Sequence, residues 1–288
     1  MNWKAAGMAG TALLTIAMSG AGAVAGANKF SGNISLDVGQ TWQDSDFAGL
    51  SDDDSFASLG GSAALNTQIF SNLNLQLGVL GEAAFFDASD NRKTGVQFDA
   101  HVYTRNDTYA VGLFGGVGVA STVDDESADY YYVGAEAQYY LDAFTIGLNG
   151  GYLDSDSSGI RDDEFLTEAW FANAEVRWYA TPKVTVTGKV GYLTGEFDRS
   201  RFDQETWSWG LKAEYIPEPK EPMSLWIAYD GRSSEFDRIA PGADREKDSH
   251  TVSIGVTFTF GVDGTKMEQD RSGPAFNQMD YGAIVVGG

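Results

Sequence analysis

The 288-residue chain contains no cysteine and only 6 prolines, and its basic residues are less than half as numerous as its acidic ones. Without cysteine, the chain can form neither a disulfide framework nor a thiolate metal site. With 19 Lys and Arg against 41 Asp and Glu, the net charge is -22. The phosphates of a nucleic acid would repel such a chain, so we expect no nucleic-acid partner. Divalent cations would be attracted instead.

Long apolar runs are missing except at the amino terminus. There, Lys4 precedes an apolar stretch around Leu14, and Ala25-Gly26-Ala27 fits an A-x-A cleavage site. We interpret residues 1–27 as a signal peptide that is removed on export, and an uncleaved membrane anchor is the alternative. After Ala27, no apolar run is long enough to predict a transmembrane helix.

The rest of the chain lacks a helical period and shows strict alternation in its place. In "AEVRWYATPKVTVTGKVGYL", residues 174–193, apolar or small residues alternate with mostly charged or polar ones. Such alternation predicts β-strands, because successive side chains of a strand point to opposite faces of its sheet. About twelve such runs are present, near 30–43, 57–70, 73–86, 95–105, 108–120, 130–141, 144–153, 166–179, 183–194, 205–215, 223–232 and 249–260.

The connections between these runs alternate in length. Short turns are predicted at 71–72, 106–107, 142–143, 180–182 and 217–222. Longer loops, which contain most of the acidic residues, are predicted at 44–56, 87–94, 121–129, 154–165, 195–204 and 233–248. An up-and-down sheet with short turns on one side and long polar loops on the other is typical of a transmembrane barrel.

The two faces of the predicted strands differ in charge. One face is apolar through its centre, as at Leu113, Val117 and Ile254. We assign this face to lipid, although a soluble sandwich with its apolar face inward would show the same alternation. The charged face is assigned to the lumen, and its candidate pore-lining residues are Asp37, Glu82, Asp99, His101, Arg105, Glu136, Glu175, Arg177, Lys189, Lys212, Glu214 and Asp230.

Aromatic residues distinguish a barrel from a sandwich. Pairs such as Trp170 and Trp178 lie on the apolar face, 8 residues apart. That separation spans roughly 19 Å along the axis of a tilted barrel, near the height of the apolar band between two aromatic girdles. We therefore predict an all-β fold, a transmembrane antiparallel up-and-down β-barrel of about 12 strands over residues 28–260. Its predicted membrane-interface aromatics are Tyr131, Tyr139, Phe144, Tyr152, Trp170, Trp178, Trp207 and Tyr215.

The last predicted strand carries a resemblance to a known family. "SIGVTFTF", residues 253–260, resembles the carboxy-terminal signal of bacterial outer-membrane proteins through Gly255, Phe258 and Phe260. The resemblance implies a porin-like barrel in the outer membrane of a Gram-negative bacterium, without identifying a subfamily. It also implies the insertion machinery, outer-membrane lipid and lipopolysaccharide as partners.

This chain departs from the family because it continues for 28 residues after the terminal aromatic, through 261–288. We expect the tail to hang in the periplasm or to enter the lumen. Its glycine-rich composition favours disorder.

The predicted barrel suits a small pore. Twelve strands lie between the eight of a filled barrel and the sixteen of an aqueous channel. We expect passive diffusion of small solutes, with weak cation preference because acids outnumber bases on the lumen face. Pairing of these charges across a closed lumen is the alternative. Space in the lumen is predicted from Gly112, Gly116, Gly118, Gly147 and Gly151.

Two other functions remain open. Acidic loops would suit a structural or surface-interaction barrel that binds divalent ions. Outer-membrane phospholipases and lipid A deacylases are similar in size, and their chemistry needs a base beside a nucleophile. His250 with Asp248 and Ser233 is the nearest approach to such a set. Because nothing else supports it, we expect no enzyme activity and no catalytic residues.

One acidic loop resembles part of a calcium site. In "DSDSSGIRDDEF", Asp154, Asp156 and Ser158 alternate before a glycine, as in the first half of an EF-hand loop, and Asp162 adds an oxygen. The usual final glutamate is displaced by one residue. The loop therefore predicts either a single weak Ca²⁺ site or loose binding by a solvated acidic loop, and no other cofactor is expected.

Overall fold

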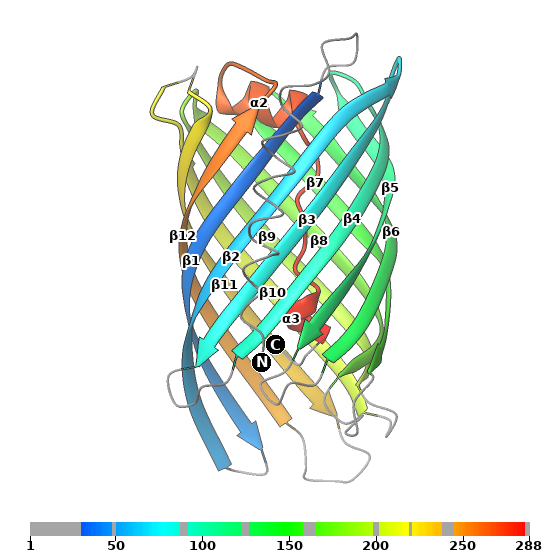
Figure 1. The fold of residues 1–288 in the computed structure, drawn as a ribbon, viewed down its shortest axis with the longest axis vertical. Coiled ribbons are helices and arrows are strands. Elements are labelled where there is room, and N and C mark those ends of the chain that lie inside the picture. Colours follow the sequence, from blue (N-terminus) through cyan, green and yellow to red (C-terminus); the bar gives the residue numbers. More distant parts are fainter. Residues whose placement is uncertain are drawn as a thin grey trace, which may run out of the picture.

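The computed structural model describes residues 30–47, 50–86, 92–121, 127–157, 165–197, 202–218, 221–237 and 245–285. Within these residues, twelve strands form a closed barrel in which each strand pairs with its neighbours in the chain and β1 pairs with β12 (Figure 1). This confirms the predicted twelve-stranded antiparallel barrel. The predicted signal peptide, 1–27, lies outside the described residues. The strands are β1 (Phe30–Phe47), β2 (Leu50–Phe70), β3 (Leu73–Phe86), β4 (Arg92–Arg105), β5 (Tyr109–Ser121), β6 (Ser127–Leu141), β7 (Phe144–Ser157), β8 (Leu166–Thr181), β9 (Val184–Phe197), β10 (Phe202–Tyr215), β11 (Met223–Asp237) and β12 (Arg245–Phe260).

Short polar side chains form the tight turns. In the turn between β4 and β5, the Asn106 side chain accepts hydrogen bonds from the backbone N–H groups of Thr108 and Tyr109, at 2.8 and 2.9 Å. Between β8 and β9, the hydroxyl of Thr181 accepts from Lys183 and Val184. Asn and Thr stabilise tight turns in this way because their side chains reach backbone groups two residues on.

At the opposite end, the strands continue farther than the sequence pattern predicts. The pairing of β1 with β2 runs to Phe47 and Leu50, so most of the predicted loop 44–56 is strand. These paired strands project beyond the rest of the barrel in Figure 1. The alternation of apolar residues stops where the outer face of a strand no longer has to be apolar. Hydrogen bonding between the strand backbones continues beyond that point, because it does not depend on which side chains face outward. For the same reason, strand shortens the predicted loop 154–165 at its first end and the predicted loop 233–248 at both ends.

The apolar face of the strands points outward. Leu113 is 66% exposed, and Val117 and Ile254 are also exposed. The predicted interface aromatics lie on this outer face at two levels. Phe144 stacks beside Trp178 near the tight turns, with ring centroids 6.4 Å apart, and Tyr152 lies 5.2 Å from Trp170 near the other rim. Among the described residues, no helix is long and apolar enough to cross a membrane.

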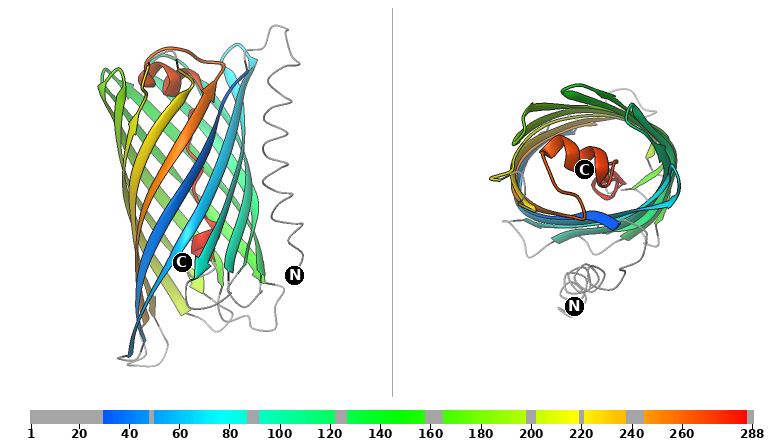
Figure 2. Two further views of the ribbon diagram at one scale, coloured as in Figure 1. Left: turned by 60° about the vertical axis from the view of Figure 1, so that its left-hand side comes forward. Right: turned by 90° about the horizontal axis from the view of Figure 1, so that it is seen from above.

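The chain after β12 enters the barrel. Left-handed backbone at Gly261 (φ 77°) and Gly264 (φ 112°) reverses its direction, and the short helix α2 (Lys266–Ser272) then lies across the mouth at the tight-turn end (Figure 2). From there an extended segment passes through the lumen to a single helical turn, α3 (Gly282–Val285). Residues 261–285, for which composition favoured disorder, thus form an ordered lumenal segment, which we call the tail.

Candidate pore

All the candidate pore-lining residues lie on the inner face of the barrel, but the tail divides them into two environments. One half of the inner wall, formed by β3–β8, is covered by the tail. The other half, formed by β9–β12 with β1 and β2, faces an open cavity, which also reaches residues of β3–β8 beside the tail, such as Glu82, Gln97 and Glu136.

The covered half is filled by aromatic side chains that lie over glycines. A Cβ on Gly112 would lie 2.5 Å from the carbonyl oxygen of Val102 and would collide with Tyr103. Likewise, one on Gly151 would lie 2.8 Å from the ring of Phe171. Aromatics also cover Gly116 and Gly118. The expectation that these glycines leave open space was wrong, because rings from neighbouring strands occupy it. Gly147 differs, since its nearest neighbouring side-chain atom would be 3.7 Å away.

Three of the predicted pore residues are enclosed in this half. His101 is 3% exposed, and its Nδ1 and Nε2 lie 2.9 Å from Glu136 and 3.1 Å from Asp99. The imidazole also stacks between Phe114 and Phe276 of the tail, at 5.8 and 5.9 Å. Because both ring nitrogens face carboxylates inside a packed cluster, this group serves as packing and charge pairing around the tail.

A second charged network fixes α2 at the mouth. The Lys266 ammonium of α2 lies 3.1 Å from Glu214 of β10 and 2.7 Å from Asp270. Burial lowers the pKa of Lys266, but the carboxylates of Asp270 and Glu214 outweigh burial and raise the pKa above its usual value. Arg177 of β8 pairs with Glu175 at 2.5 Å and approaches Asp270 at 4.0 Å. The carboxylate of Glu214 and the guanidinium of Arg177, both on strands, therefore hold the helix in place.

Arg105 and Arg271 complete this attachment. Arg105 of β4 donates to the carbonyl oxygens of Gly273 and Ser272, at 2.6 and 3.0 Å. Arg271 of α2 donates to the carbonyl oxygens of Leu141 and Phe144 beside a tight turn. Arg105 was predicted to line a pore, and the structure places it under the tail.

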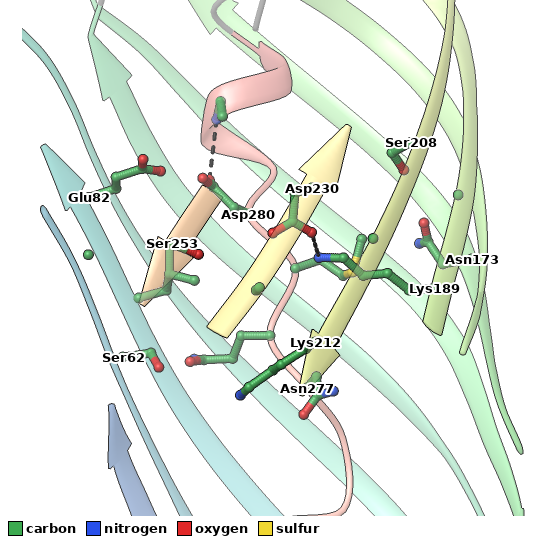
Figure 3. Close-up of a pocket in the computed structure, with 18 of the residues that line it drawn as sticks. Ser62, Glu82, Asn173, Lys189, Ser208, Lys212, Asp230, Ser253, Asn277 and Asp280 are labelled. Carbon is green, nitrogen blue, oxygen red and sulfur yellow. Dashed lines mark hydrogen bonds and ion pairs between the residues drawn. The ribbon is translucent and has the colours of Figure 1, made fainter. Parts of the chain in front are cut away.

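The open half borders a cavity of about 570 Å³, drawn in Figure 3. Serine, threonine and asparagine side chains make up much of its lining, with charged groups among them. Lys189 pairs with Asp230 at 2.7 Å, and Lys212 lies 3.6 Å from Glu214. The predicted residues that border this cavity are Asp37, Glu82, Glu136, Glu175, Arg177, Lys189, Lys212, Glu214 and Asp230.

The tail forms one wall of this cavity. Asn277, Met279 and Asp280 border the open space, and the carboxyl group of Asp280 lies against that of Glu82 from β3. Sequence reasoning missed these residues, and it also missed Gln76, Gln97 and Gln138, which contact the tail. The sequence does carry a signal for the three glutamines, because they are amide side chains on the inner face of the strands.

The predicted insertion residues lie at the seam between β12 and β1. The Phe260 ring covers Gly32 of β1, and Phe258 faces outward. Gly255 is covered by the inward-pointing ring of Trp226. Their role in insertion stays a prediction.

The candidate calcium ligands are only partly described. Asp154 and Asp156 lie in β7 rather than in a loop, while Ser158 and Asp162 fall outside the described residues. Across the parts of the chain that the structure describes, no group of three or more His, Asp or Glu side chains could hold a metal ion. The single weak Ca²⁺ site stays a prediction.

His250 lies on the outer face and forms no catalytic set with Ser233 in the described contacts. Its Nδ1 lies 2.8 Å from the hydroxyl of Tyr229, and the two rings stack at 6.0 Å. Ser233 is opposite Asp248 in the pairing of β11 with β12. A phenol hydroxyl thus occupies the position at the imidazole that a serine nucleophile would need.

Comparison with known proteins places the fold. No protein-family model matches the chain, and no curated protein sequence matches it. An outer membrane channel from Pseudomonas putida F1 matches with a TM-score of 0.51 and 12% identity, over 80% of this chain and 96% of that chain. The KdgM porin matches with a TM-score of 0.46 and 11% identity, over 78% and 99%. The P. putida toluene transporter TodX matches with a TM-score of 0.44 and 8% identity, over 81% and 90%. At such identities the likeness is one of fold, and the chain has the closed barrel fold of outer-membrane channels, with no subfamily identified.

Proposed function

We propose that this protein is an outer-membrane pore for the passive diffusion of small solutes, with a weak preference for cations. The observation that carries the proposal is the polar cavity of about 570 Å³ that remains between the tail and the open half of the wall. A cavity with polar walls is readily hydrated, and hydration is what a passive diffusion path requires.

The charges around this cavity favour cations weakly. Lys189 is neutralised by Asp230, and the charges around α2 pair with one another. Among the other charges that line the cavity, Asp37 and the contacting pair of Glu82 and Asp280 outnumber Arg232. A net negative lining attracts cations and repels anions, but the surplus is small.

The tail limits the size of the solute. Because α2 lies across one mouth and the extended segment continues inside (Figure 2), a solute must pass beside the tail along the length of the lumen. We therefore expect small solutes and not oligomers to pass. We further propose export by the signal peptide 1–27, followed by insertion by the outer-membrane machinery next to lipopolysaccharide.

Planar-bilayer recording on the purified mature chain tests the proposal. Discrete conductance steps should appear, and under a KCl gradient the reversal potential should have the sign of a cation-preferring pore. If the folded barrel produces no steps at any voltage, the lumen is closed and the proposal fails.

A further inference from the structure

We propose that the inner wall of β3–β8 is a binding groove for an extended peptide, and that the chain's own tail occupies it. This site adjoins the proposed pore, because Gln97, Gln138 and Phe276 also border the open cavity, but peptide binding is a function beyond solute diffusion. The evidence lies in which atoms of the tail the strands contact, how its aromatic residues are held, and how the wall is shaped.

Glutamine side chains bind the main chain of the tail. Gln76 of β3 donates to the carbonyl oxygen of Phe276 at 2.7 Å and accepts from the N–H group of Phe276 at 3.3 Å. Gln138 of β6 donates to the carbonyl oxygen of Ala275 at 2.5 Å. Two hydrogen bonds to the N–H and C=O groups of one residue are the pairing that a neighbouring antiparallel β-strand would supply, so this recognition suits any extended peptide.

Gln97 of β4 repeats the arrangement farther along. It donates to the carbonyl oxygen of Met279 at 2.9 Å and accepts from the N–H group of Tyr281 at 3.4 Å. The hydroxyl of Tyr130 donates to the same side-chain oxygen at 3.1 Å and fixes its orientation. All three glutamines are buried, with Gln76 fully so. The main chain of the tail thus takes the place of the water that would hydrate these amides in an empty lumen.

Two aromatic residues of the tail, 5 positions apart in the sequence, are held by separate pockets. Phe276 packs edge-on to Tyr103 at 5.1 Å and parallel to His101. Tyr281 lies 4.5 Å from Tyr132 and 4.8 Å from Phe171. Each pocket buries a ring almost completely, and buried rings of this kind dominate the free energy of peptide binding.

The strands leave a shaped space for the peptide. A Cβ at Gly134 would lie 2.6 Å from the ring of Phe114, so the ring lies flat against the wall. At Gly78, a Cβ would collide with both the Gln278 side chain of the tail and the Asp99 carboxylate. Glycine at these positions therefore creates a groove whose floor is formed by β3, β5 and β6.

None of these contacts requires the covalent link to β12. The linker at 261–264 turns with positive φ at its glycines and does not contribute to the groove contacts. The tail occupies the groove because tethering gives it a high effective concentration. The ligand class is thus an extended peptide with aromatic residues at its first and sixth positions. Here the chain's own tail supplies this peptide, and a separate peptide of the same kind should be able to bind in its place.

A binding experiment with a free peptide tests this directly. The chain is truncated after Gly264, folded in detergent, and titrated against a fluorescent peptide with the sequence of residues 272–285. Anisotropy should show saturable binding to the truncated barrel, and binding at least about tenfold weaker to the full chain, in which the tail competes. A peptide with Ala in place of Phe276 and Tyr281 should bind at least about tenfold more weakly, since each lost ring contact is worth a tenfold change or more.

A second variant keeps the test decisive if truncation impairs folding. The full chain with Phe276→Ala and Tyr281→Ala retains α2 as its anchor but loses both rings, so the free peptide should displace its tail. Adding Gln97→Leu should then weaken peptide binding. Equal binding of the native and ring-less peptides, or no saturable binding to either folded variant, overturns the proposal. Because anisotropy does not depend on conduction, a failed pore would leave this result unaffected.

Discussion

The two halves of the inner wall are built on the same backbone and differ in what occupies the lumen beside them. Along β4–β8, rings such as Tyr132 and Phe171 lie over glycines and pack against the tail. Along β9–β12, β1 and β2, short hydroxyl side chains pair with one another, as Thr41 does with Thr251 at 2.8 Å. The first half forms a hydrophobic core inside the barrel, whereas the second stays polar. Strand number alone therefore does not determine whether a barrel of this size is filled or open.

The largest effect on conductance is expected from deleting the lumenal part of the tail, which separates the two halves of the inner wall. Deletion of residues 274–288 leaves α2 in place but clears the lumen, so single-channel conductance should rise at least about twofold, because the tail and the cavity share one cross-section. Planar-bilayer recording measures it. Lys183→Ala, which removes an exposed ion pair with Glu218 at the rim, serves as the control and should leave conductance unchanged. A deletion variant with native conductance would mean that the tail does not limit the path.

Glycine substitutions compare the packing of two inner-face positions. Gly112→Ala places a methyl group against a backbone carbonyl and Tyr103, and should lower the free energy of unfolding by about 2–3 kcal/mol. Gly147→Ala meets only ordinary contacts and should be neutral or stabilising by about 0.5 kcal/mol, since glycine weakens a strand. Urea unfolding in detergent, followed by tryptophan fluorescence, measures both. Equal losses at the two positions would contradict the tight packing assigned to the filled half.

The difference between these positions shows where sequence reasoning stopped. The alternation of side chains was sufficient to predict twelve strands and to predict that every candidate pore residue points inward. It was sufficient because the side-chain period of a strand is a local property. It could not show that Gly116 and Gly118 lie under rings from adjacent strands, because cross-strand register is set by the closed barrel. The lumenal position of Phe276 and Tyr281 was equally hidden, since their partners are distant in sequence.

Charge substitutions in the two halves of the inner wall should have different effects on ion selectivity. Asp37→Asn removes a carboxylate of β1 that borders the cavity, so the ratio of cation to anion permeability should fall by less than about twofold, because a unit charge roughly 10 Å away in water changes an ion's energy by about 0.4 kcal/mol. Asp99→Asn alters a carboxylate that is paired with His101 in the packed half and does not line the cavity, and should change stability but not selectivity. Reversal potentials under a KCl gradient measure both. A larger shift from Asp99→Asn would mean that ions pass along the packed half of the wall instead.

The smallest expected effect concerns the rim of the filled half, where the hairpin of β7 and β8 carries its acidic residues. Asp154 and Asp156 lie in β7, on the same face of the strand, and Asp154 accepts a hydrogen bond from Tyr152 at 3.3 Å. An extended strand separates alternate carboxylates more than the sharp turn of a calcium loop does, so any site must draw its other oxygens from the following loop. A single site there should bind Ca²⁺ no tighter than about 10⁻⁴ to 10⁻³ M. Calorimetry should show saturable heat for the native chain and none for the Asp154→Asn, Asp156→Asn variant, while Asp44→Asn on β1 of the open half should leave the heat unchanged. Equal, non-saturating heats from the native chain and both variants would mean that the hairpin attracts Ca²⁺ only through its diffuse negative charge. The rims of the two halves would then not differ in Ca²⁺ binding.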